Sequence, residues 1–242
     1  MSELQRLDKI LSNMGFGSRK EVKALIKSGC VEIDDEVIKE AEEKIDAEHQ
    51  IIRVNGKILN YRKHVYILMN KPQDVISATE DARCETVLEL LDGEYSNYQL
   101  GPVGRLDKDT EGLMLLTNDG KLSHGLTSPK RGIPKIYYAE ISGTVDNEDV
   151  AAFKEGIVLE DGYKTLPADL EVIEKAEFSK IRLTIYEGKF HQVKRMFEAV
   201  DKKVVYLKRL SIGTLELDES LKPSQYRELT DEDLKDLVQL IG

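Results

Sequence analysis

The stretch Gly104-Arg105-Leu106-Asp107-Lys108-Asp109-Thr110-Glu111-Gly112 places a carboxylate in a glycine-bounded loop just before the apolar run of residues 113–117. That run has the composition of a buried strand, so the loop is expected to lead into a sheet. Asp107 has a cation two residues before it and another directly after it, and such neighbours favour an ionised, nucleophilic carboxylate. The alternative is that Asp107, or Asp109 with Thr110, organises a turn by bonding its own backbone.

Composition favours an ordinary globular protein. The 242 residues are 40% hydrophobic and 33% charged, which allows one large or two smaller domains. No apolar run approaches the roughly 20 residues of a membrane helix, and residues 1–9 do not resemble a signal peptide. Cys30 and Cys84 lie far apart in the sequence, without metal-ligand spacing nearby. We therefore expect a cytoplasmic protein with no membrane partner, no disulfide framework and no metal site.

The charge distribution matters more than the net charge. A net charge of -10 argues at first against nucleic-acid binding, which normally shows as a basic footprint. The charges are segregated along the chain, however, so an acidic protein can still carry a cationic surface. Acidic residues gather in segments 32–48, 146–160 and 218–236, and basic residues in segments 19–27, 130–135 and 189–209.

Two short helices are predicted near the N-terminus. The first ends at Gly15-Phe16-Gly17 and has an apolar stripe made of Leu4, Leu7, Leu11 and Met14. The second begins at Ser18, which can form a capping box with Glu21, and ends at Gly29. Its apolar stripe is Val22, Leu25 and Ile26, and its polar face carries Arg19, Lys20, Lys23 and Lys27.

That basic face fits a helix laid against a phosphate backbone, although a merely solvated face is the alternative. Residues 31–37 and 51–55 are predicted to be short strands. Residues 56–63 form a polar connection, and the pattern changes after it. We therefore predict an N-terminal domain of residues 1–59 and a second domain of residues 60–242.

The second domain mixes strand and helix patterns. Strands are predicted at residues 65–69, 113–117, 135–141, 170–173, 181–186 and 204–210, and helices at residues 86–91, 148–155 and 191–200. At the end of the chain, Thr230 and Asp233 can cap a helix that packs back on the sheet, with the stripe Leu234, Leu237, Val238 and Ile241. The fold class is therefore α+β.

Three further features of this domain can carry chemistry. Lys71, in Met69-Asn70-Lys71-Pro72, either faces a substrate or lies on the surface. Tyr137 begins a strand after the basic loop Lys130-Arg131 and is either functional or a packing residue. In residues 187–197, a glycine turn feeds a helix whose buried stripe leaves Lys194 at its edge; the alternative for Lys194 is a pair with Glu198.

The N-terminal order of motifs resembles the S4 RNA-binding module. The resemblance rests on Arg6-Leu7-Asp8-Lys9, on Gly17-Ser18-Arg19-Lys20-Glu21-Val22 and on Ile26-Lys27-Ser28-Gly29-Cys30-Val31. It implies a small helical unit followed by a β-ribbon, in which the second helix meets structured RNA. The chain departs from the module at the ribbon turn, which is acidic (residues 32–36), so contacts of that turn with RNA are not expected.

Nearly the whole chain resembles the S4-bearing pseudouridine synthases that modify ribosomal RNA. The resemblance rests on the Asp107 loop, on Lys135-Ile136-Tyr137, on Glu187 to Met196, and on Leu207-Lys208-Arg209-Leu210-Ser211-Ile212-Gly213. It implies a mixed, mainly antiparallel sheet in the catalytic domain. No cofactor is implied, because the reaction breaks N1–C1′ of uridine and rejoins C5 to C1′ without redox chemistry or an added group.

The resemblance also implies roles for residues. Asp107 is the expected catalytic aspartate, supported by Arg105 in the space of the flipped nucleotide, Tyr137 stacked on the base, and Lys194 as the basic partner of Asp107. Asp109 is expected to shape the turn that presents Asp107. The remaining candidates are expected to contact RNA, namely Arg6, Arg19, Lys20, Lys23, Lys27, Lys71, Lys130, Arg131, Lys189, His191, Arg195 and Arg209.

The compact C-terminal end resembles the small-subunit, 16S-directed enzymes, whereas large-subunit enzymes often carry extended basic tails. We therefore expect a monomer that acts on 16S RNA, in an assembly intermediate of the small subunit. Two alternatives stay open, a 23S-directed pseudouridine synthase and a noncatalytic S4-type RNA-binding or ribosome-assembly protein.

Overall fold

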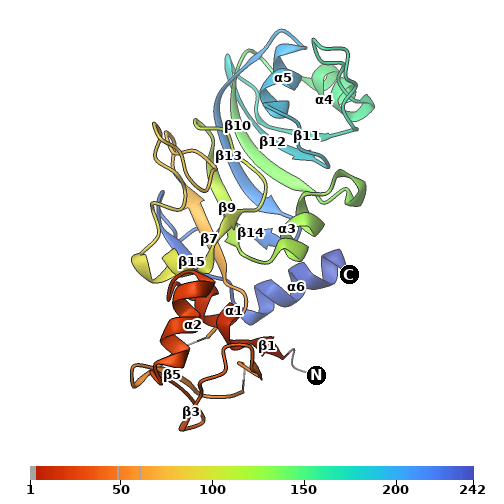
Figure 1. Cartoon of the computed structure of the whole chain (residues 1–242). Helices are drawn as coiled ribbons and strands as arrows, with labels where there is room; N and C mark the ends of the chain where they lie inside the picture. Colours follow the sequence, from red (N-terminus) through yellow and green to blue (C-terminus); the bar gives the residue numbers. More distant parts are fainter. Residues whose placement is uncertain (1–3, 48, 60) are drawn as a thin grey trace. The chain divides into compact units, whose positions relative to one another are not determined.

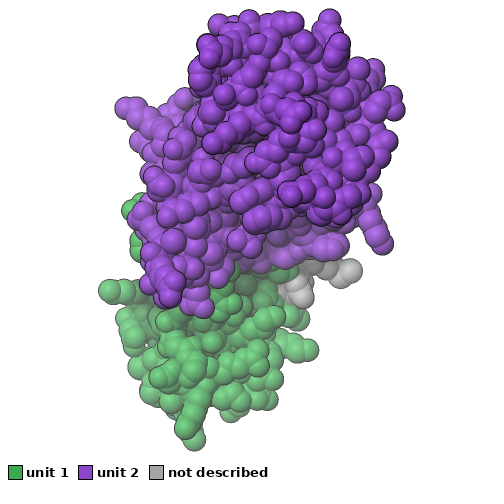
Figure 2. Space-filling model, turned by 90° about the horizontal axis from the view of Figure 1, so that it is seen from above, with its two compact units in different colours: residues 1–65, 91–100 green, residues 66–90, 101–242 purple. Residues whose placement is uncertain are grey.

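The computed structural model describes residues 4–47, 49–59 and 61–242, and the chain forms two compact units (Figures 1 and 2). The first unit comprises residues 1–65 and 91–100, and the second comprises residues 66–90 and 101–242. Residues 91–100 thus belong to the first unit although they lie inside the sequence of the second. No helix within the described ranges is long and apolar enough to cross a membrane.

The first unit packs two helices on a small sheet. Helix α1 (Leu7–Asn13) and helix α2 (Arg19–Lys27) enclose an apolar core with four strands paired in the order β3-β2-β5-β6. These strands are β2 (Val31–Ile33), β3 (Glu36–Val37), β5 (Ile52–Val54) and β6 (Lys57–Ile58); β1 (Gln5–Arg6) pairs separately with β4 (Lys44–Ile45), and a 3-10 helix, η1 (Gly93–Tyr98), completes the unit.

The start of helix α2 is set by its capping residues. Ser18 and Glu21 form the predicted capping box, in which the Ser18 amide donates to Glu21 Oε2 at 2.8 Å. Helix α1, by contrast, is shorter than predicted, because residues 5 and 6 are drawn into a strand pair with β4. Leu4 lies outside α1 and is 57% exposed, so its predicted place in the apolar stripe was wrong.

The second unit is built on a nine-stranded sheet with the order β11-β12-β10-β13-β9-β7-β15, to which β14 adds on β13 and β8 on β9. Strands β13 and β9 run parallel, and the other pairs described are antiparallel. The predicted α+β class with a mixed, mainly antiparallel sheet is therefore confirmed. The strands are β7 (Tyr66–Lys71), β8 (Gly101–Pro102), β9 (Glu111–Thr117), β10 (Lys135–Ser142), β11 (Asp169–Glu174), β12 (Phe178–Ile185), β13 (Lys203–Ile212), β14 (Leu215–Glu216) and β15 (Tyr226–Glu228).

Four α-helices and a short 3-10 helix, η2 (Pro129–Arg131), accompany this sheet. Figure 1 shows α4 (Asn147–Glu155) and α5 (Gln192–Glu198) together near one end, and α3 (Gly120–Thr127) and α6 (Asp231–Ile241) near the other. Phe153 of α4 and Phe197 of α5 bring their ring centroids to 4.8 Å and join the first pair. The second pair closes a core over the sheet that includes Leu122, Leu126, Leu237 and Ile241.

One predicted helix is absent, and one helix that forms was not predicted. Residues 86–91 were predicted to be helical and instead form a bridge and a turn. The capping signal there is real, since the Thr86 amide donates to Glu89 Oε2 at 2.6 Å, but no helix follows it. Helix α3 was not predicted, because Gly120 and Gly125 weaken its sequence signal.

The C-terminal helix follows its prediction except at one residue. Thr230 and Asp233 form the capping box, and the side chains of Leu237 and Ile241 are buried. Val238 was predicted in the buried stripe and is 50% exposed. The helix therefore presents a narrower apolar face than its sequence indicates.

Candidate active site

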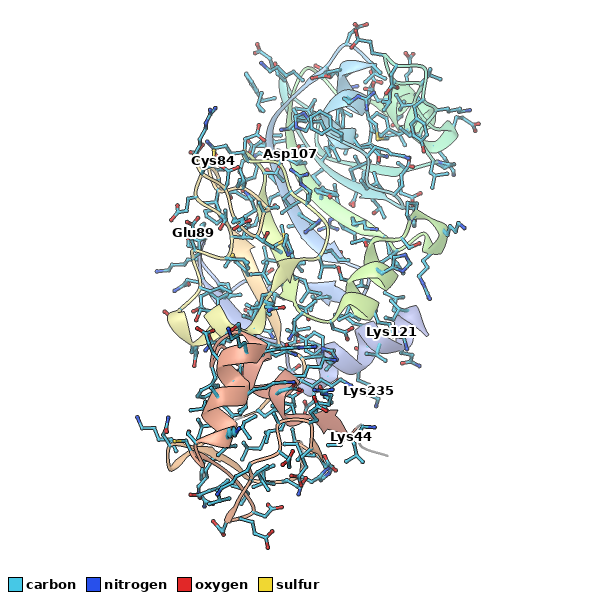
Figure 3. All side chains as sticks on the ribbon, viewed as in Figure 1. Lys44, Cys84, Glu89, Asp107, Lys121 and Lys235 are labelled. Carbon is cyan, nitrogen blue, oxygen red and sulfur yellow. The ribbon has the colours of Figure 1, made fainter. Side chains whose placement is uncertain are left out.

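The Asp107 loop links β8 to β9 and is closed by a turn, in which the Thr110 amide donates to the Asp107 carbonyl at 3.0 Å. The Asp107 side chain is 26% exposed, so it is accessible without being fully solvated. Figure 3 shows it near Cys84, in keeping with the 3.9 Å between Lys108 Nζ and Cys84 Sγ. Arg105, expected to support the site, is exposed in the same loop.

Ser77 fixes the backbone just before Asp107. Its hydroxyl donates to the Leu106 carbonyl at 2.8 Å and accepts from the Leu106 amide at 3.0 Å. Both peptide groups are buried, where a lost hydrogen bond costs about 1–3 kcal/mol. Ser77 is therefore a positioning residue that the sequence analysis did not identify.

Lys71 supports the Asp107 loop from inside the protein. Its ammonium is fully buried and donates to the carbonyls of Pro72 at 2.8 Å, Thr110 at 2.9 Å and Lys108 at 3.3 Å. Burial lowers the pKa of Lys71 to about 8, although the charges of Asp109 and Asp107 act in the opposite direction. The predicted RNA contact of Lys71 was wrong, because an ammonium that satisfies three carbonyls inside the protein does not face a ligand.

The far end of the loop rests on β13. Gly112 has φ +103° and lies so close to β13 that an added Cβ would meet the Arg209 carbonyl at 2.3 Å. In return, Arg209 Nε donates to the Leu113 carbonyl at 2.8 Å. Arg209 is 3% exposed, so its predicted RNA contact was also wrong. The guanidinium instead stabilises β9, the strand after the Asp107 loop.

A lysine from α5 reaches two carboxylates of the loop. Lys194 Nζ lies 3.3 Å from Asp107 Oδ2 and 2.6 Å from Asp109 Oδ1. Burial of the ammonium acts to lower the pKa of Lys194, but the hydrogen bond to Asp109 and the charges of both carboxylates outweigh it and raise this pKa. Lys194 thus joins the loop rather than the alternative partner Glu198, and Asp109 does more than shape the turn.

His191 is the second side chain that lies beside the Asp107 carboxylate. Its Nε2 lies 3.5 Å from Asp107 Oδ1, and its backbone has φ +49°, a left-handed conformation that is unusual for a residue other than glycine. The conformation turns the chain from the glycine loop directly into α5. His191 was predicted to contact RNA, and the structure places it against the Asp107 carboxylate.

A buried carboxylate anchors the start of α5. Glu187 is 3% exposed and accepts from the Leu166 amide at 2.9 Å, from Gln192 Nε2 at 3.1 Å and from the Tyr163 hydroxyl at 2.6 Å. A buried charge needs such partners, and these three come from both sides of the turn. They fix the segment that carries His191 and Lys194.

Tyr137 lies in the middle of the sheet, between Leu183 of β12 and Arg209 of β13. Its side chain is 8% exposed. Burial lowers the pKa of Arg209, and the neighbouring Tyr137 partly offsets this effect. Lys135, on the same strand, is also buried, and desolvation followed by the charge of Arg209 lowers its pKa to about 8.

The other residues predicted to contact RNA form two groups: those that already bind another group of the chain, and those whose side chains are exposed. Several cations already hold partners within the chain. Arg195 pairs with Asp161, Arg131 donates to the Ile241 carbonyl, Arg6 binds Asp8 and Glu42, and Lys23 pairs with Glu42. Exposed side chains remain at Arg19, Lys20, Lys27, Lys130 and Lys189. Those five are the better candidates to meet phosphate.

Chemically, the site offers an accessible carboxylate flanked by an ammonium and an imidazole, on a backbone held by buried hydrogen bonds. Such a carboxylate can attack an electrophilic carbon or accept a proton. Among the residues that the structure describes, no group of three or more His, Cys, Asp or Glu side chains could hold a metal ion.

Comparison with known families matches both units. The RNA pseudouridylate synthase family matches residues 65–199, and the S4 domain matches residues 5–51. The first match includes Asp107, Tyr137 and Lys194. The chain is also similar to a crystal structure of a pseudouridylate synthase, with a TM-score of 0.68 and 37% identity, covering 96% of this chain and 99% of the other.

Relatives of nearly equal length point to the same family. An uncharacterised RNA pseudouridine synthase of Bacillus subtilis is 50% identical over 95% of this chain and 96% of its own length. Ribosomal small subunit pseudouridine synthase A of Vibrio cholerae is 43% identical over 95% of this chain and 97% of its own length. On this evidence, the chain belongs to the RNA pseudouridylate synthase family, in a form that carries an S4 domain ahead of the catalytic unit.

Proposed function

We propose that this enzyme converts one specific uridine of 16S ribosomal RNA, a uridine-516-type site, to pseudouridine. The observation that carries the proposal is the Asp107 carboxylate, held 3.3 Å from Lys194 on a loop fixed by Ser77 and Lys71. The small-subunit substrate is favoured by the name of the Vibrio cholerae relative.

The chemistry proceeds within one bound nucleotide. The N1–C1′ bond breaks, the uracil rotates, a C5–C1′ bond forms, and the proton of C5 leaves to solvent while N1 gains one. Asp107 attacks C1′, adds to the uracil ring, or removes a sugar proton; each route needs this carboxylate beside the target. Arg105 fills the place of the flipped nucleotide and Tyr137 supports the base, which offsets an unstacking cost of a few kcal/mol.

The exposed face of α2 supports RNA docking by the first unit. Arg19, Lys20 and Lys27 are exposed there. The whole chain has a net charge of -10, which disfavours binding to RNA phosphates. We therefore propose that the substrate is magnesium-folded RNA or a small-subunit assembly intermediate. We also propose that the enzyme acts as a monomer.

The test uses unmodified 16S and 23S transcripts with tritium at uridine C5. We expect tritium release from 16S RNA at a single mapped position. Release from 23S RNA alone would contradict the substrate, and no release from either RNA would favour a noncatalytic RNA-binding protein. Comparing naked RNA with assembly intermediates tests the preferred form of the substrate.

The matched variant is Asp107→Asn. It should abolish tritium release while RNA affinity stays within about tenfold, because losing one anion near phosphates does not weaken binding. Substantial residual activity would show that another residue is catalytic.

A further inference from the structure

Phe190 is an exposed aromatic side chain at the edge of the active site. It is 77% exposed, the largest value for a large apolar side chain in the described part of the chain. Most phenylalanine rings in folded proteins are buried, so this ring loses the stabilisation that burial would give.

The ring is nevertheless held in place. It stacks on His191 with a centroid distance of 3.8 Å and an interplanar angle of 16°. One face is therefore covered by the imidazole, and the exposure comes mainly from the opposite face and the ring edge. A ring fixed in this way loses little conformational entropy when a further flat group stacks on it.

The stack is tied to the catalytic carboxylate. His191 Nε2 lies 3.5 Å from Asp107 Oδ1, and the left-handed backbone of His191 sets the direction of the neighbouring residue. The Lys189 amide donates to Gln192 Oε1 at 2.9 Å, and Gln192 in turn is held by Glu187. Phe190 is thus positioned by the same bonds that position the site.

Its surroundings suit a nucleotide. Lys189 is exposed, so a phosphate can reach its ammonium, which lies 4.8 Å from the centroid of the Tyr163 ring in a cation–π contact. A protein partner would bring several apolar groups, whereas a single flat ring beside a cation fits one unpaired base. When a uridine leaves its stack, its neighbours lose a partner, and an aromatic ring can replace it.

We propose that Phe190, backed by His191, is a stacking subsite for an unpaired base that flanks the target uridine in the RNA. Base–aromatic stacking contributes to binding without reading the identity of the base. Phe190 is therefore a positioning residue: it holds the strand beside Asp107 and takes no part in bond breaking. This inference rests on the proposed RNA substrate.

The protein-side test compares Phe190→Ala, Phe190→Leu and Phe190→Trp by tritium release from the 16S transcript. We expect Phe190→Ala and Phe190→Leu to raise KM about tenfold with kcat within about twofold, and Phe190→Trp to restore KM. The matched control is Phe178→Ala, which removes another exposed ring, 56% exposed at the start of β12, and should leave both constants unchanged. Thermal melting should show equal stability in all four variants.

The RNA-side test places an abasic nucleotide at each position flanking the target. At one position it should raise KM for the wild-type enzyme by the same factor as Phe190→Ala, and it should have no further effect on that variant. Additive losses at every position, or a Phe190→Leu variant equal to wild type, would overturn the stacking subsite. Absence of tritium release by the wild-type enzyme would instead reject the proposed function.

Discussion

Lys194 Nζ lies 2.6 Å from Asp109 Oδ1, closer than it lies to the catalytic candidate Asp107, at 3.3 Å. Desolvation acts to raise the pKa of Asp109, but the hydrogen bond and charge of Lys194 lower it overall. The Asp109 side chain is 68% exposed, so much of its attraction is screened by water. Asp109 therefore helps to orient the Lys194 ammonium, but its screened attraction does not fix the position of that group alone.

We expect Asp109→Asn to keep kcat within about fivefold, because an amide oxygen still accepts from Lys194, whereas Lys194→Met lowers kcat about 100-fold. Tritium release under saturating RNA measures both. If Asp109→Asn were as inactive as Asp107→Asn, the two carboxylates would have to share the catalytic role.

Removing the buried ammonium of Lys71 should destabilise the second unit. Lys71→Met keeps the apolar stem but leaves the carbonyls of Pro72, Lys108 and Thr110 without their donor, which costs about 2–4 kcal/mol. Urea unfolding measures the loss, and Lys121→Met, at an exposed lysine of α3, should change stability by less than about 0.5 kcal/mol. A Lys71→Met variant of wild-type stability would contradict the supporting role.

Alkaline pH should weaken the loop before it weakens the fold. The pKa of Lys71 is lowered to about 8 from 10.5. Between these values the unfolded chain binds more protons than the folded chain, so this group makes the free energy of unfolding rise with pH. The neutral amine, however, has only two N–H groups for three carbonyls. We expect kcat to fall as pH passes about 8 while the melting temperature shows no matching loss from this group.

Lys135 provides the control for this pH profile, because burial lowers its pKa to about 8 as well. Its ammonium donates to one carbonyl, that of Ile133, and the neutral amine keeps that bond. Lys135→Met should therefore retain the alkaline fall in kcat, and a profile that loses it would assign the titration to Lys135.

The cations of α2 should contribute unequally to RNA binding. Arg19 and Lys20 are exposed, whereas Lys23 already pairs with Glu42 at 3.2 Å. Replacing Arg19 and Lys20 by alanine should weaken affinity about tenfold and reduce the slope of log K against log salt by about 1.5, with a smaller effect for Lys23→Ala. Filter binding over a salt series measures the slopes, and equal slopes would mean that α2 does not contact phosphate.

Sequence patterns predicted the features that depend only on residues close together in the chain, such as helix caps and strand alternation. The boxes at Ser18 and Thr230 need only residues three positions apart, and the alternation of β10 needs only its own side chains. The pairing of Lys194 with Asp107 came from motif order, since 87 positions separate them and no local rule joins them.

Long-range packing explains the failures. Lys71 and Arg209 read as surface cations, and their burial depends on carbonyls at positions 110 and 113. Phe190 drew no assignment because exposure is a property of the folded chain. Helix α3 was missed because Gly125 weakens its sequence signal. The structure requires a glycine there, because an added Cβ would come within 2.9 Å of Ile241.

The parallel contact of β13 with β9 also bears on how the enzyme is made. Arg209 and Leu113 are 96 positions apart, and Lys194 and Asp109 are 85 apart, so the Asp107 loop lacks its lateral support until residues 203–212 have been synthesised. Contacts of such separation form late in folding. A nascent chain that has been synthesised only as far as β9 thus carries Asp107 without Lys194 and without the strand that supports its loop.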